Sequence, residues 1–139
     1  MNKFAIAFGI AVLALFAACS SSGSTDTGKV IKSTAVGNNL TVTLSNKDGV
    51  LKNGDNEFFV SFKDGSGKTV DVGAVGLNFY MPTMGTMSAM NKATTFTTTS
   101  TPGVYQGKAT LESAGEWQAQ VSYEGSAVKG KATFPVIAQ

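Results

Sequence analysis

The sequence predicts an all-β protein built from two packed antiparallel sheets, and three observations lead to this class. Apolar and polar residues alternate with a period of two over several short segments, as in strands with one buried face. Turn-forming pairs such as Asn38-Asn39 and Asp64-Gly65 separate these segments. The chain has 16 glycines and is rich in Thr and Val, a composition that favours strands and turns. About seven or eight strands at this spacing predict an immunoglobulin-like sandwich, with an edge-strand or barrel variant as the open alternative.

The clearest predicted strands are those in which every second residue is apolar. They are expected at 40–45, 58–62, 77–81, 116–124 and 128–136. Weaker strands are expected at 30–35, 94–99 and 104–111. We expect the aromatic side chains, Trp117 above all, to fill the layer between the two sheets.

The first 18 residues predict a lipoprotein signal peptide. Lys3 is followed by an apolar run over 4–18, which is too short to span a bilayer but typical of a secretory signal. Two alanines precede Cys19, and cleavage there would leave a cysteine whose sulfur and new amino group accept acyl chains such as palmitate. This segment resembles a bacterial lipobox, with Phe16 where leucine is usual. The alternative is an ordinary cleaved signal followed by an unrelated cysteine.

Lipidation at Cys19 would make this an extracytoplasmic protein anchored to a membrane, because two or more acyl chains hold a protein there stably. Ser20 favours the outer membrane in a Gram-negative host. We therefore expect three parts: a signal peptide at 1–18, a lipidated cysteine and flexible linker at 19–28, and the β-sandwich domain at 29–139.

Composition argues against several classes of function. Every basic residue is a lysine and no basic stripe is evident, so nucleic acid is not an expected partner. Cys19 is the only cysteine, which leaves no intrachain disulfide and no thiolate metal site. Without histidine, neither a Ser-His nor a Cys-His catalytic pair can form. We therefore expect a protein that is not an enzyme.

The unusual feature is a methionine-rich segment. Four methionines occur at intervals of three, and they are Met81, Met84, Met87 and Met90. Thioether sulfur is a soft, neutral ligand that selects Cu(I) or Ag(I) and works in an oxidising compartment. A spacing of three would bring the sulfurs to one side of a helical turn or of a polyproline-like stretch, while Pro82 and Gly85 favour a loop at the start. The sequence thus predicts a metal site formed by the four methionines, with Cu(I) as the expected ion.

Other interpretations of these methionines stay open. Methionine fills irregular gaps in cores, and Met81 ends an alternating strand, so this residue could belong to the core. A flexible methionine-rich surface could also hold an apolar partner without any metal. Reversible sulfoxide formation would make it an oxidant sink.

Several short motifs resemble the YtkA-like domain, a family related to FixH-type segments. They are Gly54-Asp55-Asn56, Asp64-Gly65, Met81-Pro82-Thr83-Met84-Gly85, Pro102-Gly103-Val104-Tyr105 and Gly115-Glu116-Trp117, over roughly 38–136. The resemblance implies an immunoglobulin-like sandwich and a link to metal handling outside the cytoplasm. It matches Met81 and Met84 by position. Many members carry a histidine where this chain has Thr86 and Met87, a departure that favours an all-sulfur Cu(I) site over Cu(II).

Two functional hypotheses follow. The first is a lipid-anchored module that binds Cu(I) or Ag(I) through its methionine loop for metal handling or delivery to a metal-efflux or copper-assembly protein. The second is a structural or interaction module whose methionine loop docks onto a partner such as an efflux adaptor, without metal.

Overall fold

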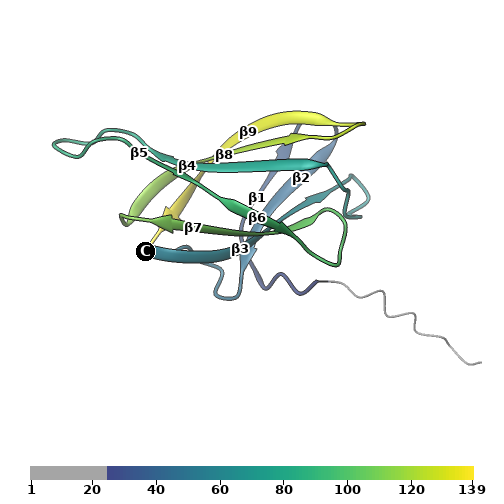
Figure 1. Ribbon diagram of the computed structural model, residues 1–139, viewed down its shortest axis with the longest axis horizontal. Coiled ribbons are helices and arrows are strands. Elements are labelled where there is room, and N and C mark those ends of the chain that lie inside the picture. The colour runs from purple at the N-terminus through teal and green to yellow at the C-terminus, as the bar shows by residue number, and fades with distance from the viewer. Residues whose placement is uncertain (1–24) are drawn as a thin grey trace, which may run out of the picture.

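Strands form where the sequence alternates, and they build two antiparallel sheets (Figure 1). The computed structural model describes residues 25–139; the predicted signal peptide and Cys19 lie outside this range. The described part contains nine strands and no helix: β1 (Lys29–Val36), β2 (Leu40–Asn46), β3 (Gly54–Lys63), β4 (Ala74–Met81), β5 (Met90–Ala93), β6 (Thr95–Thr98), β7 (Val104–Leu111), β8 (Gly115–Glu124) and β9 (Lys129–Ala138). Within it, no helix is long and apolar enough to cross a membrane.

The strand order confirms the predicted sandwich. One sheet has the order β1-β2-β3-β7-β6 and the other has the order β5-β4-β8-β9. The subset β2-β3-β7-β6 facing β4-β8-β9 reproduces the ABED and CFG sheets of an immunoglobulin domain. Strands β1 and β5 extend one edge of each sheet. The described residues thus contain one strand more than expected, because β5 lies in the methionine-rich segment where we predicted a loop.

The aromatic side chains fill the space between the sheets, as predicted. Trp117 is fully buried on β8, and its indole N–H donates a hydrogen bond to the Ser113 carbonyl at 3.0 Å. Phe58 meets Phe79 of the opposite sheet edge-to-face, with ring centroids 5.7 Å apart. Such pairs stabilise a core beyond the apolar area that they bury. Within residues 25–139, every buried apolar residue lies between Leu40 and Ala138.

Two predicted turns have a clear structural cause. Asn38 and Asn39 both adopt positive φ, at 64° and 57°, as a type I′ turn between paired strands requires. At the second turn, one oxygen of the Asp64 carboxylate accepts hydrogen bonds from the backbone N–H groups of Ser66 and Lys68. These contacts hold the chain between β3 and β4 without a helix.

The residues before β1 lie against the five-stranded sheet. We expected 19–28 to be a flexible linker, yet the Thr25 N–H donates to the Thr101 hydroxyl at 2.9 Å. From there the chain passes beneath the sheet to reach β1 (Figure 1). Three residues on the outer face of the five-stranded sheet are buried, although the alternation directs them away from the core. They are Ser45, Ser61 and Val104. We call Thr25–Gly28 the strap, because it joins the β6–β7 turn to the opposite edge of the same sheet.

Candidate functional site

The methionine-rich segment forms the β4–β5 hairpin, which projects from one end of the sandwich (Figure 1). Met84 and Met87 exchange two backbone hydrogen bonds at its tip, of 3.2 and 2.9 Å. Gly85 has a φ of 57° at the first central position of the turn, where a type II′ turn requires glycine. The expected helical turn or polyproline-like stretch is therefore wrong. A tight two-residue turn folds this segment back on itself.

This turn sorts the four methionines into two pairs. Met84 lies opposite Met87, and Met81 lies opposite Met90. Directly opposed residues on an antiparallel pair place their side chains on the same face, with Cβ atoms about 5 Å apart. The two pairs are separated by three residues along the hairpin, which corresponds to about 10 Å of extended chain. The backbone thus brings the methionines together two by two.

The two pairs differ in exposure. The Met84 side chain is 54% exposed and that of Met87 is 44% exposed. Met81 is 2% exposed within the core, and its terminal methyl group lies beside Gly115 at the start of β8. Met90 is half-buried and packs against the core. Only the tip pair therefore offers both sulfurs to an ion arriving from solvent.

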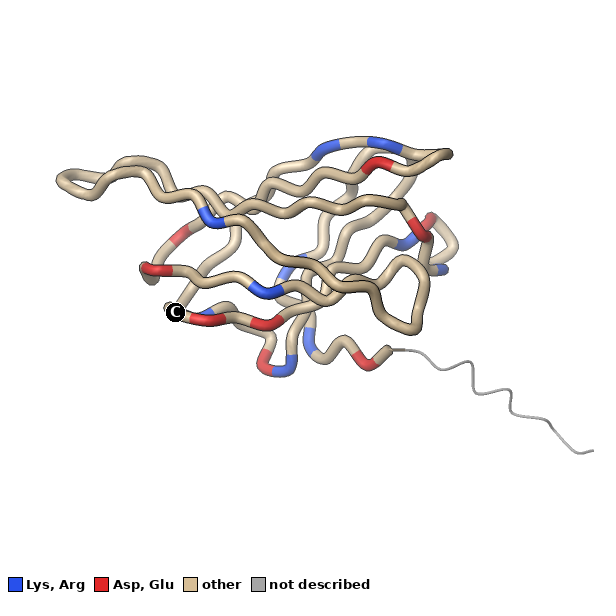
Figure 2. The backbone as a smooth tube through the Cα atoms, in the orientation of Figure 1, with Lys and Arg blue, Asp and Glu red and all other residues tan. Residues whose placement is uncertain are grey.

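The tip of the hairpin carries no charged side chain. No Asp, Glu, Lys or Arg occurs from Val72 to Asn91, and the backbone tube is uncoloured along the tip (Figure 2). The first charged group after the tip is Lys92, whose ammonium lies 2.6 Å from the Glu112 carboxylate. At the base of the hairpin, the Asn78 amide donates to Asn91 and to Gln120. The environment of the tip is thus neutral, which suits a monovalent cation held by uncharged sulfur.

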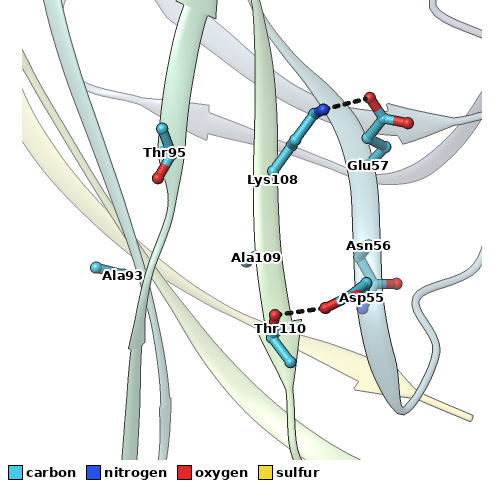
Figure 3. Close-up of a pocket in the computed structure, with 8 residues that line it drawn as sticks. All are labelled: Asp55, Asn56, Glu57, Ala93, Thr95, Lys108, Ala109 and Thr110. Carbon is cyan, nitrogen blue, oxygen red and sulfur yellow. Dashed lines mark hydrogen bonds and ion pairs between the residues drawn. The ribbon is translucent and has the colours of Figure 1, made fainter.

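A second candidate is a surface cleft of about 510 Å³ over β3, β6 and β7 (Figure 3). Its charged side chains form ion pairs or hydrogen bonds with other residues of the cleft. The Lys108 ammonium lies 3.3 Å from the Glu57 carboxylate, and the Thr110 hydroxyl donates to Asp55 at 2.6 Å. The Asn56 side chain points inward and binds the backbone of 52–54. The carboxylates and the ammonium group that line this cleft therefore already have partners within the protein.

A polar pair at the opposite end of the sandwich was not anticipated from the sequence. The Tyr105 hydroxyl donates to the Asp71 carboxylate at 3.0 Å and lies 3.1 Å from the Gly73 carbonyl oxygen. Burial, followed by the hydrogen bond to Asp71, raises the pKa of Tyr105 to about 12. The Gly73 N–H and the Tyr105 hydroxyl lower the pKa of Asp71. No local pattern marks this pair, because its members are 34 positions apart.

This pair predicts a loss of stability in alkali. Because the pKa of Tyr105 is about 12 when folded and about 10 when unfolded, ionisation favours the unfolded chain between these values. The contribution of Tyr105 is fully present below pH 10 and is lost as the pH rises through 12. We expect Tyr105→Phe to reduce the fall in unfolding free energy between pH 9 and 11.5, measured by urea denaturation. Equal falls in both proteins would contradict this, since the other titrating groups are common to both.

The sequence of this sandwich matches one known protein family. A family model described as YtkA-like matches residues 34–122, which span β1 to β8 and include the methionine hairpin. The chain belongs to the YtkA-like family. No curated protein matches it, and no solved structure does. The matched range begins four residues before the range of roughly 38–136 over which the short motifs of the YtkA-like domain were recognised, and it ends inside that range.

The described part of this YtkA-like domain contains no group of three or more Asp, Glu, His or Cys side chains that could hold a metal ion. The methionine hairpin offers thioether sulfurs as donor atoms, and it is the candidate metal site. Cys19, the predicted lipidation site, lies outside the described residues. The pairing of Met84 with Met87 was not predicted from the sequence, although Gly85 at the first position of a two-residue turn is a signal for it.

Proposed function

We propose that this YtkA-like protein is an extracytoplasmic lipoprotein, anchored through Cys19, that binds Cu(I) or Ag(I) at its methionine hairpin. The observation that carries the proposal is the Met84–Met87 pair. Two thioethers are held opposite each other by backbone hydrogen bonds, and both are exposed on a neutral, projecting tip. Thioether sulfur selects soft monovalent ions over Zn(II) or Ca(II). The role is binding and delivery of metal, without catalysis.

Within this proposal the four predicted ligands have different tasks. Met84 and Met87 are the primary ligands, because ion capture costs no rearrangement of the core. Met90 is half-buried, and Met81 would have to leave the core to reach an ion at the tip. Withdrawing a buried methionine from a packed core costs about 2 kcal/mol or more. We therefore assign Met81 to packing and to support of the hairpin.

Chelator competition tests this assignment. The fragment 20–139 contains every core residue of the part that the structure describes, and it is suitable once circular dichroism shows that it is folded. We expect it to withdraw Cu(I) from a chromophoric chelator, and the Met84→Leu, Met87→Leu double variant to withdraw less than about a tenth as much. Leucine conserves volume and apolarity, so the fold should persist.

Met81→Leu is the matched control for this experiment. It removes one sulfur from the same segment but from a buried position, and it should bind Cu(I) like the wild type. Weaker binding by Met81→Leu would favour a site formed by all four methionines. Retention of Cu(I) by the double variant would contradict the proposal.

The second candidate function is docking of a partner protein, such as an efflux adaptor, by the same tip. Exposed, uncharged methionines on a projecting hairpin favour it, because methionine adapts to varied apolar surfaces. A wild-type protein that withdraws no Cu(I), yet loses a co-purifying partner when Met84 and Met87 are both changed to Ser, would select this role.

A further inference from the structure

The tip pair leaves a bound ion short of ligands. Met84 and Met87 supply two sulfurs, whereas Cu(I) and Ag(I) held by neutral thioethers alone favour about three or four. The hairpin itself does not complete the set. The next methionine pair lies about 10 Å back along the strands, and Met81 is enclosed in the core. Neighbouring amides and hydroxyls offer oxygen and nitrogen, which are harder donors than sulfur.

The shape and charge of the hairpin allow a second molecule to supply the missing sulfurs. The tip extends beyond the body of the sandwich, so two tips can meet while the two bodies stay apart (Figure 1). No charged residue occurs between Val72 and Asn91, so two approaching tips meet no like-charge repulsion (Figure 2). The ammonium of Lys92, the nearest charge after the tip, is already paired with Glu112.

We propose that one Cu(I) or Ag(I) ion is held between two copies of this chain, tip to tip. Met84 and Met87 of each copy contribute two sulfurs, and a two-fold axis through the ion generates a site of four thioethers. Two-fold contacts of this kind are self-complementary, since each copy offers the same pair. The inference rests on the proposed function, because it needs the tip to bind metal.

Metal is required for this association. A stable protein interface buries about 1,200 Å² or more, and two hairpin tips of four residues each cannot provide that area. The tips therefore do not hold two copies together without an ion. The dimer should form at a low ratio of metal to protein and separate again when excess metal occupies every tip singly.

Silver titration tests the proposal, because Ag(I) has the same preference for soft ligands and is stable in air. The fragment 20–139 is titrated with silver nitrate in a chloride-free buffer, and its mass is followed by native mass spectrometry and sedimentation velocity. We expect a monomer without metal, a dimer carrying one ion near half an equivalent, and monomers carrying one ion each in excess Ag(I). Met81→Leu should behave like the wild type.

The outcomes separate this inference from the proposed function. Binding of one Ag(I) per monomer, with no dimer at half an equivalent, would overturn the bridged site and leave metal binding by the hairpin intact. Absence of any Ag(I) binding would contradict both. A dimer that persists in the Met84→Leu, Met87→Leu variant would show that another surface joins the copies, and it would also overturn the bridged site.

Discussion

Trp117→Ala is expected to lower the free energy of unfolding by about 3–5 kcal/mol. Trp117 is fully buried as part of the core between the two sheets, so its removal leaves a large cavity there. It also leaves the Ser113 carbonyl oxygen without the hydrogen bond that the indole N–H donates to it. Since a domain of this size is stable by only about 5–15 kcal/mol, this loss is a large share of the total stability.

Denaturation in urea followed by far-ultraviolet circular dichroism measures this effect, because the variant lacks the chain's one tryptophan as a fluorescent probe. Ile137→Ala is the matched control. Ile137 is a large apolar residue on β9 that is 62% exposed, and its truncation should cost less than about 1 kcal/mol. A loss below about 1 kcal/mol for Trp117→Ala would show that the space between the sheets closes around the cavity.

Cys19→Ser is expected to abolish acylation of the protein completely. Cys19 is the only cysteine, so no other thiol can receive a diacylglycerol group. Cells supplied with an alkyne-bearing fatty acid should yield labelled wild-type protein, and mass spectrometry should find a mature chain that begins at residue 19. Two or more acyl chains give stable membrane attachment, so the mature wild-type protein should partition into detergent.

Ser20→Ala is the control for this experiment, because it changes the adjacent residue and leaves the thiol in place. It should be labelled like the wild type. Labelling of Cys19→Ser, or a wild-type chain that is cleaved but unlabelled, would select the ordinary secretory signal in place of the lipobox.

Alternation was sufficient to predict most of the sandwich from the sequence. Strand β8 places an apolar residue at every second position from Trp117 to Tyr123, and burial follows that pattern residue by residue. Strand β5 lacks the signal, because Met90-Asn91-Lys92-Ala93 is short and only half-buried. It becomes a strand because the turn at Gly85 brings it back beside β4.

The candidate site was only partly predictable. The methionines and their softness are visible in the sequence, but their partners depend on where the chain turns. A spacing of three suggests a single cluster, whereas a hairpin centred on Gly85-Thr86 joins the inner two residues and the outer two separately. Burial of Met81 depends on β8, more than 30 positions further along the chain. Tertiary contacts of this kind leave no local pattern.

The strap gives the sandwich a direction relative to its attachment point. Five residues separate Cys19 from Thr25, so the point where Thr25 meets Thr101 can lie at most about 20 Å from residue 19. The β6–β7 turn there lies beside the start of β4, whereas the methionine tip follows the end of β4. With a lipid on Cys19, the length of the sandwich would separate the methionine tip from the attachment point. Neighbouring molecules on one membrane, or on two facing membranes, could then meet tip to tip.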